Sequence, residues 1–299
     1  MGPTAAGKSE IAVAIAEDLH GEVVSVDSMQ VYRGMDIGTA KPGPHERARV
    51  PHHLLDLVEP EEIFSVARFQ REGRQVLAGL REQGRPAVIV GGSGLHFRAL
   101  VDPLRFAPTD PTLRRELEEL EPMAAQAVLR AADPGAGSHV DLRNPRRVVR
   151  ALEVLRLTGA TPSQRAGSRE AREVRRYRPR LAFSAVGIDP GELLEARVED
   201  RLEEMMAAGL LEEVAALVDR LGPTARQAVG YKELLPVVRG KASLEEGLAG
   251  ACRATLELAR RQRTYFRRDP RIHWIAWSPD PDQRREAVRL ALEEAGFSR

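Results

Sequence analysis

The sequence is poor in cysteine and in long apolar runs, and each shortage narrows the possible classes of protein. A single cysteine, Cys252, in 299 residues excludes a disulfide framework and any multi-cysteine zinc site. No apolar run approaches the roughly 18–20 residues that span a membrane. No secretory signal peptide opens the chain, because Pro3, Gly7 and Lys8 interrupt its start. We therefore expect a cytoplasmic protein that does not enter a membrane.

Lysine is also scarce, although charged residues are plentiful. The chain has 45 basic and 44 acidic residues, and only Lys8, Lys41, Lys232 and Lys241 are lysines. A lysine in so arginine-rich a sequence is informative, because a guanidinium cannot replace a compact ammonium at a tight site.

The formal net charge is only +1, but the charges are segregated along the chain. Residues 143–180 contain twelve arginines and three glutamates, and residues 253–271 contain seven arginines and two acidic residues. Such a distribution is typical of a surface that binds phosphates. The alternative interpretation is a set of solvated helix faces.

The first residues form a phosphate-binding pattern. The pattern G-x-x-x-x-G-K-[ST] is matched by Gly2, Pro3, Thr4, Ala5, Ala6, Gly7, Lys8 and Ser9. Its glycines allow backbone N–H groups to converge on an anion, Lys8 reaches the terminal phosphates, and the Ser9 hydroxyl can bind Mg²⁺. Apolar residues in 10–19 predict a buried helix whose N-terminus faces the phosphates. We expect this loop to bind a diphosphate with Mg²⁺.

Two further apolar segments, 22–27 and 86–90, predict strands. The first ends in Asp27, and the second runs into the Gly-Gly-Ser-Gly loop 91–94. Because the carboxyl ends of strands face the ligand crevice of an α/β sheet, Asp27 points toward the phosphates. It is either a metal-associated acid or a general base for a substrate beside the diphosphate. Ser93 offers a hydroxyl in a loop that can approach a ligand closely.

Alternating strands and helices predict an α/β fold, a P-loop NTPase-like three-layer sandwich with a parallel sheet. We expect the core to consist of 1–103 and of 181–299 with its C-terminal helices, and a helical, arginine-rich insertion to occupy 104–180. The apolar positions of 193–221 predict one core helix. A P-loop fold has a buried strand ahead of the loop, where only Met1 stands. We expect either a clipped or mis-assigned start, or an absent central strand and a weakened sheet.

Residues 27–42 resemble the signature of the bacterial tRNA dimethylallyltransferases, also known as tRNA isopentenyltransferases or the IPP transferase family. Further segments resemble blocks of the same family along the whole chain, in order: 2–9, 51–56, 64–69, 91–95, 144–154, 227–232 and 259–264. The departures are small. Relatives commonly have threonine where Ser93 stands and tyrosine where His96 stands.

The resemblance implies that a dimethylallyl group passes from its diphosphate to N6 of the adenosine on the 3′ side of the anticodon (position 37). The tRNAs are those that read codons beginning with U. The loop and Lys8 would then stabilise the departing diphosphate with Mg²⁺ at Ser9, Asp27 would take the amine proton, and the Ser93 hydroxyl would hydrogen-bond near the reacting centre. The adenosine would be flipped out of its stack.

The resemblance also implies three regions of tRNA contact and two single positions. These are Asp27, Ser28, Met29 and Gln30; Arg146, Arg147, Val148, Val149 and Arg150; Gln227, Ala228, Val229, Gly230, Tyr231 and Lys232; and Ser93 and Arg114. We expect a monomer whose partners are the tRNA anticodon stem-loop and dimethylallyl diphosphate. The competing interpretations are a small-molecule P-loop kinase and a non-catalytic RNA-binding nucleotide switch.

Overall fold

The computed structural model describes residues 1–296 of the chain. Internal contacts divide the chain into two compact units, Met1–Leu100 with Ala182–Arg299, and Val101–Leu181. We term them the α/β unit and the helical unit. The ends of the helical unit lie close to residues 104 and 180, the predicted limits of the insertion.

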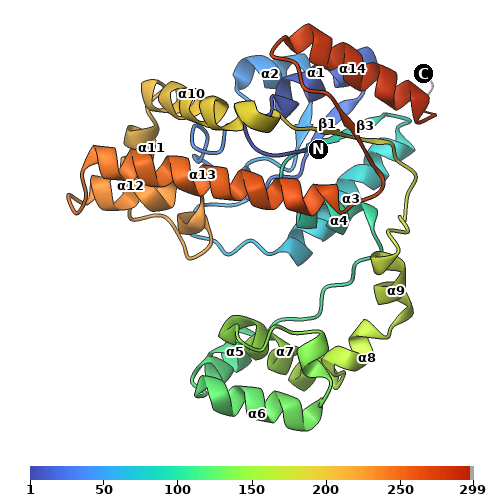
Figure 1. Cartoon of the computed structure of the whole chain (residues 1–299), viewed down its shortest axis with the longest axis vertical. Coiled ribbons are helices and arrows are strands. Elements are labelled where there is room, and N and C mark those ends of the chain that lie inside the picture. Colours follow the sequence, from blue (N-terminus) through green and yellow to red (C-terminus); the bar gives the residue numbers. More distant parts are fainter. Residues whose placement is uncertain (297–299) are drawn as a thin grey trace. The chain divides into compact units, whose positions relative to one another are not determined.

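The strands of the α/β unit form two small parallel sheets (Figure 1). In the first sheet β1 (Glu22–Ser25) lies between β2 (His52–His53) and β3 (Ala87–Val90). In the second, β4 (Ala185–Ile188) pairs with β5 (Ile272–Ile275). The predicted α/β fold with parallel strands is confirmed, but the one sheet expected from the sequence is two sheets.

Met1 explains how the first loop is attached to this framework. Its amino group donates to Val186 O (2.7 Å), and Ile188 N–H donates to Met1 O (2.9 Å), so Met1 runs along β4. Gly2 then packs so closely that a Cβ would lie 2.1 Å from Ile188 O. Within residues 1–296, β3 pairs with β1 alone. No strand therefore joins β3 to β4, and the two sheets stay separate.

Helices pack on both sheets of the α/β unit. α1 (Lys8–Asp18) buries Ile11 and Ile15 in a cluster that includes Val186 of β4 and Val288 of α14 (Pro281–Glu294). The other helices of this unit are α2 (Pro44–Arg49), α3 (Val66–Glu82), α4 (Gly94–Val101), α10 (Leu194–Ala207), α11 (Leu210–Leu217), α12 (Tyr231–Val238) and α13 (Leu244–Arg267). α10 and α12 both pack against the long α13, and α11 packs against α10 and α12 (Figure 1).

The single helix predicted over residues 193–221 is in fact two helices, α10 and α11. Gly209 separates them with a φ of +99°, in the left-handed region that L side chains rarely adopt. The apolar stripe continues across the break, because Val198, Leu210 and Val214 are all buried. The periodicity therefore predicted the buried face correctly and missed the turn.

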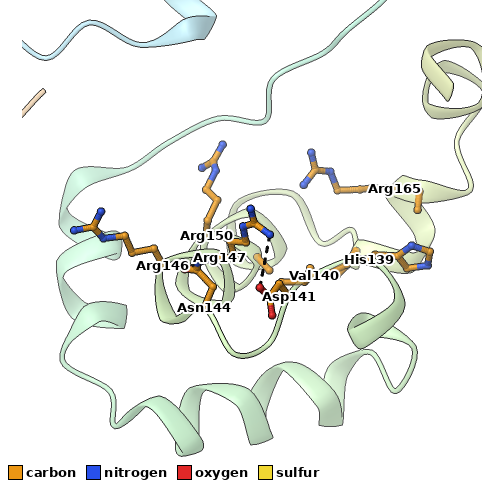
Figure 2. A pocket seen from close by; sticks show the side chains of 11 residues that line it. His139, Val140, Asp141, Asn144, Arg146, Arg147, Arg150 and Arg165 are labelled. Atoms are coloured by element: carbon orange, nitrogen blue, oxygen red, sulfur yellow. Dashed lines mark hydrogen bonds and ion pairs between the residues drawn. The ribbon is translucent and has the colours of Figure 1, made fainter. Parts of the chain in front are cut away.

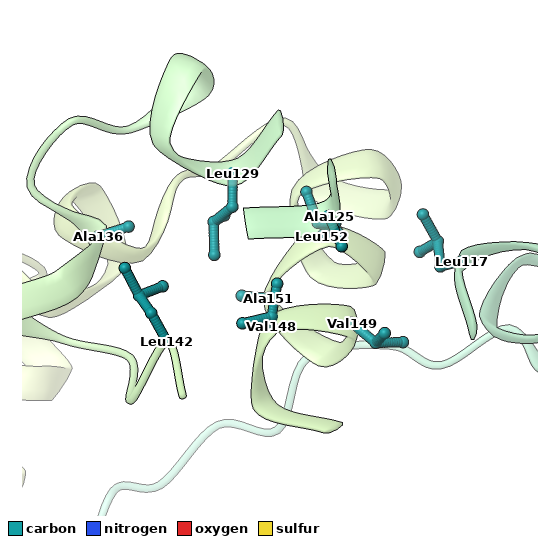
Figure 3. Close-up of a cluster of buried hydrophobic side chains, with 9 residues drawn as sticks. All are labelled: Leu117, Ala125, Leu129, Ala136, Leu142, Val148, Val149, Ala151 and Leu152. Carbon is teal, nitrogen blue, oxygen red and sulfur yellow. The ribbon is translucent and has the colours of Figure 1, made fainter. Parts of the chain in front are cut away.

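The helical unit has its own hydrophobic core (Figure 3). Its centre is formed by Leu129, Val148 and Leu152, each at most 1% exposed. Proline at the first turn and a capping side chain at the N-cap begin four of its helices, which suits the missing N–H of proline. These four are α5 (Pro111–Glu118), α6 (Pro122–Ala132), α7 (Pro145–Thr158) and α8 (Pro162–Ala166), and α9 (Arg169–Arg175) follows without such a proline.

Among residues 1–296, no helix combines the length and the apolar character needed to cross a bilayer.

Candidate functional site

The loop from Gly2 to Ser9 begins beside β4 and ends in the first turn of α1. Gly2, Ala5 and Gly7 all have positive φ, and Gly7 is the residue that precedes α1. Residues with positive φ placed between residues with negative φ can turn successive N–H groups toward one side of the backbone. The start of an α-helix adds its own free N–H groups and the positive end of its dipole. The backbone of this segment is therefore suited to bind an anion.

Three side chains outside the motif hold this loop in place. Gln262 of α13 accepts a hydrogen bond from Thr4 N–H (2.8 Å), and Arg197 of α10 donates to Ala5 O (2.6 Å). Trp277 donates its indole N–H to the next carbonyl of the loop (3.2 Å). None of the three was found from the sequence, because each comes from an element more than 180 residues away along the chain.

Positive charge is concentrated beside the loop. Burial, followed by repulsion from Arg201 of α10, lowers the pKa of Lys8 to about 7. Burial also lowers the pKa of Arg201. The Lys8 ammonium donates a hydrogen bond to Pro3 O, within the loop itself. Two cations held together with little water favour an anionic ligand, and Arg201 is a member of this site that the sequence analysis did not identify.

Asp27 follows β1 and lies within electrostatic reach of this cationic pair. Its negative charge opposes the lowering of the pKa of both Lys8 and Arg201. Its Oδ1 accepts hydrogen bonds from Met29 N–H (2.8 Å) and Gln30 N–H (3.4 Å), which fixes the carboxylate at the start of a turn. No hydrogen bond to Oδ2 occurs among residues 1–296, so this oxygen is available to a substrate.

Ser93 stands next to Asp27 because two backbones approach each other closely. Ser93 N–H donates to Val26 O (3.1 Å), which ties the loop after β3 to the end of β1. At Gly91, whose φ is +155°, a Cβ would lie only 2.6 Å from Val26 O. Ser93 Oγ lies 2.7 Å from Nδ1 of His96, in the first turn of α4. The charge of Asp27 acts on both Lys8 and His96, and His96 contacts Ser93, so the structure places Lys8, Asp27 and Ser93 near one another.

Several residues of the predicted tRNA-contact regions have buried side chains. Val148 and Val149 belong to the core of the helical unit, and Ala228 is also buried. The amide of buried Gln30 accepts from Ser25 Oγ (2.8 Å) and donates to the carbonyls of residues 39 and 40 (3.1 Å each). The side chains of these residues pack inside the protein and support their neighbours, so they do not form an exposed surface. Gln227 and Lys232 are exposed.

Tyr231 is completely buried and belongs to the support of the loop after Asp27. Its hydroxyl donates to Glu213 of α11 (2.5 Å), and burial together with the Glu213 carboxylate raises the pKa of Tyr231. The same carboxylate accepts the N–H groups of Asp36, Ile37 and Gly38 at 2.8–3.0 Å. Glu213 therefore fastens the signature segment to α11, and Tyr231 orients Glu213.

Lys41 shows why a lysine is retained in that segment. Its side chain is 1% exposed, and its ammonium donates to Tyr32 O (2.6 Å), Asp36 (2.6 Å) and Asp56 (2.7 Å). Three donors that diverge from one nitrogen suit an ammonium better than a planar guanidinium. Lys41 is therefore a structural residue.

The arginines predicted on the helical unit divide into two kinds. Arg114 and Arg150 both donate to Glu153 (2.6 Å each), a glutamate with no exposed surface. Burial alone would raise the pKa of Glu153, but these hydrogen bonds and one from Asp110 N–H (2.9 Å) outweigh it, and the pKa is lowered. Arg150 also donates to the carbonyls of residues 107 and 108 (2.8 Å each).

Arg146 and Arg147 are exposed beside an open pocket of about 780 Å³ (Figure 2). Arg147 has only a distant pairing with Asp141 (3.9 Å), and Arg146 has no ion pair within residues 1–296. The pocket is lined by His139, Val140, Asp141, Asn144, Arg146, Arg147, Arg150, Ala151, Pro162, Arg165 and Ala166. Four arginines against one aspartate give this pocket an excess of positive charge that suits an anion, although Arg150 is already bound to Glu153.

A metal ion in a protein is usually held by several histidine, cysteine, aspartate or glutamate side chains. No group of three or more histidine, cysteine, aspartate or glutamate side chains within residues 1–296 is arranged to bind one. The Ser9 hydroxyl, which follows Lys8 at the start of α1, is exposed.

The fold combines an α/β unit, whose first loop is suited to an anion, with a helical unit that exposes several arginines. A family model described as IPP transferase matches residues 30–269. The chain is 45% identical to the tRNA dimethylallyltransferase of Moorella thermoacetica, with 95% of this chain and 90% of the relative aligned. It is also 45% identical to that of Streptomyces coelicolor, over 98% and 93% of the two chains.

A crystal structure has the same fold. The tRNA isopentenylpyrophosphate transferase of Bacillus halodurans superposes with a TM-score of 0.69 at 35% identity, and 99% of this chain and 94% of that chain are covered. This chain therefore belongs to the IPP transferase family, as the resemblance of its motifs indicated.

Proposed function

We propose that this chain transfers a dimethylallyl group from dimethylallyl diphosphate to N6 of the adenosine on the 3′ side of the anticodon, at position 37. The tRNAs would be those that read codons beginning with U, and diphosphate would be released. One observation carries the proposal: Lys8, Arg201, Asp27 and Ser93 meet at the carboxyl ends of β1 and β3, beside the N-terminus of α1.

The loop from Gly2 to Ser9 would bind the diphosphate as a P-loop, within a three-layer P-loop core. Charge moves onto the diphosphate oxygen as the carbon–oxygen bond of the donor breaks. Loop N–H groups, Lys8 and Arg201 would stabilise this developing charge, which is the largest electrostatic contribution available in a site of this kind. The loop would thus hold a leaving group, with no phosphoryl group transferred.

Mg²⁺ fits the oxygen donors at this place. It prefers oxygen ligands and usually combines one or two protein oxygens with phosphate and water. The exposed Ser9 hydroxyl would hold it on the protein side. When bound, the ion would neutralise part of the diphosphate charge.

Asp27 would act as the general base. The exocyclic amine is a poor nucleophile because its lone pair is delocalised into the adenine ring. As the bond from N6 to C1 of the dimethylallyl group forms, the bonding pair of the breaking C1–O bond leaves with the diphosphate, and one N6 proton passes to Asp27 Oδ2. General-base catalysis of this kind is worth roughly 10²–10⁴ in rate.

The helical unit would bind the phosphates of the anticodon stem-loop through its exposed arginines. Arg146 and Arg147 are oriented toward solvent, and phosphate contacts supply most of the affinity in such complexes. The adenosine must leave its stack to reach the half-buried Asp27 carboxylate, which costs a few kcal/mol that the phosphate contacts offset. One copy of the chain supplies both sites, so the proposal requires only a monomer, acting in the cytoplasm where tRNA is modified.

The proposal is tested by following a label into RNA. The protein is incubated with unmodified tRNA, Mg²⁺ and radiolabelled dimethylallyl diphosphate, and in parallel with ATP labelled at its terminal phosphate. We expect label in tRNA from the prenyl donor alone, and its loss when the target adenosine is replaced by guanosine. Transfer from ATP alone would favour a kinase, and no transfer from either donor would contradict the proposal.

A further inference from the structure

His96 contacts Ser93 through an interaction that the proposed chemistry does not use. Ser93 Oγ lies 2.7 Å from His96 Nδ1. The His96 ring packs edge-on against Phe69 of α3, with 4.5 Å between ring centroids and an interplanar angle of 78°. Phe69 is itself fully buried. The imidazole is therefore held in one orientation, with Nδ1 directed at the serine hydroxyl.

We propose that His96 is a positioning residue that fixes the direction of the Ser93 hydroxyl beside Asp27. This inference rests on the proposed prenyl transfer, because it concerns the same crevice. A serine hydroxyl rotates about its Cβ–Oγ bond, and its hydrogen follows the nearest polar partner. With Nδ1 as that partner, the remaining hydrogen-bonding capacity of Oγ is directed to one place in the crevice.

The surroundings of His96 keep the ring neutral, which suits this role. Burial lowers the pKa of His96 to about 4, although the charge of Asp27 opposes the lowering. Ser93 and the apolar ring of Phe69 contact it, and Asp27, at the end of β1, lies within electrostatic reach. A neutral imidazole has one protonated and one bare nitrogen, so it can order a hydroxyl without adding a third cation near Lys8 and Arg201.

An ordered hydroxyl matters because Ser93 is tied to the end of β1 through Val26 O. Its oxygen is therefore close to the place where the amine, the transferred carbon and the diphosphate must meet. A hydrogen-bonding group that already points in the required direction costs no reorganisation during the reaction. We expect the effect to appear in the rate of the chemical step, with tRNA affinity unchanged.

A purely structural role would have a different signature. If the contact only tied the first turn of α4 to Ser93, its loss would lower thermal stability and affect every kinetic constant together. A double-mutant cycle shows whether His96 acts through Ser93, and comparison of the transfer rate with the Tm and the tRNA Kd separates the two roles.

The experiment compares single-turnover rates of dimethylallyl transfer for five variants. His96→Phe keeps a ring against Phe69 and removes Nδ1, whereas His96→Asn keeps a polar atom near the position of Nδ1. Ser93→Ala and the double variant with His96→Phe complete the cycle. His45→Phe, at an exposed position of α2, is the matched control.

We expect His96→Phe to slow the chemical step about tenfold, which corresponds to a hydrogen bond of ordinary strength. His96→Asn should restore most of the rate, and the tRNA Kd and Tm should stay near those of the unmodified protein. In the Ser93→Ala background His96→Phe should have no further effect. An equal loss in both backgrounds, or no loss with intact Ser93, would overturn the inference. Absence of transfer by the unmodified protein would instead contradict the proposed function.

Discussion

The crevice combines a carboxylate with two cations, and the placement of each charge assigns it a separate task. Asp27 uses Oδ1 to cap its own turn and leaves Oδ2 open, while Lys8 and Arg201 sit on the side of the loop. A base and an anion-binding pair can coexist at close range because a diphosphate would lie against the cations. The two roles can therefore be tested one residue at a time.

Replacement of Asp27 by asparagine should slow single-turnover transfer by about 100-fold or more, because the amide cannot accept the N6 proton. The asparagine oxygen can still accept the hydrogen bond from Met29 N–H, so the turn should persist. We therefore expect a tRNA Kd close to normal, measured by filter binding. A large loss of affinity with normal chemistry would refute the assignment of the base.

Binding of the diphosphate should be coupled to proton uptake by Lys8. The pKa of this ammonium in the protein is about 7, so at pH 8 most of the molecules carry a neutral lysine. An anionic ligand favours the charged form and raises the pKa, so binding takes up close to one proton at pH 8 and almost none at pH 6. Calorimetric titration with dimethylallyl diphosphate in two buffers of different ionisation enthalpy measures this number.

The variant Lys8→Arg is the control for that titration, since a guanidinium stays protonated throughout this range. In this variant, the number of protons taken up on binding of the diphosphate should no longer differ between pH 6 and pH 8 because of residue 8. If both proteins take up the same number of protons, the proton belongs to another group or to the ligand.

The helices of the arginine-rich segment show a different use of charge, in which a buried glutamate organises its neighbours. Glu153 in α7 accepts from Arg114 in α5 and from Arg150, and Arg150 also holds the carbonyls of residues 107 and 108. The network joins α5, α7 and the segment that leads into α5. Two of the arginines implied as tRNA contacts therefore contribute to folding, whatever else they bind.

Removal of the Glu153 carboxylate should destabilise the helical unit by about 2–3 kcal/mol, which is less than the roughly 3–5 kcal/mol for a fully buried pair because both arginines are partly exposed. The pKa of Glu153 is lowered by folding, so its contribution is present above about pH 4.5 and is lost as the pH falls below that value. Thermal unfolding of Glu153→Gln should therefore be less sensitive to pH between 5 and 3. Glu118→Gln, at an exposed position of α5, should leave that sensitivity unchanged.

The sequence predicted those elements whose pattern is local. β3 was predicted to the residue except for Pro86, since a β-branched run between turn residues is unambiguous. The break at Gly209 was missed because an apolar stripe that continues across it hides a left-handed residue. Arg201, Gln262 and Glu213 could not be found, because they act through contacts that only the fold creates. Burial of Gln30 and Tyr231 was equally invisible, since polar side chains in a signature segment suggest a surface.

For the whole molecule, the net charge of +1 does not reveal that the two units differ in how their charged side chains are arranged. In the α/β unit two cations lie within electrostatic reach of a carboxylate, and the helical unit carries exposed arginines around an open pocket. Long-range attraction to a polyanion depends on such uncompensated, exposed charges. Arginines that are already paired contribute much less.

This contrast leads to a prediction for two neighbouring arginines in α7. Arg147→Ala should weaken binding to every tRNA and reduce the slope of log Kd against log salt by about one, because an exposed guanidinium releases about one counterion from a phosphate. Arg150→Ala should mainly lower the Tm, because that side chain is bound to Glu153 and to two carbonyls. Filter binding at several salt concentrations, together with thermal unfolding, measures both quantities. An unchanged salt slope for Arg147→Ala would show that this face of α7 is simply solvated.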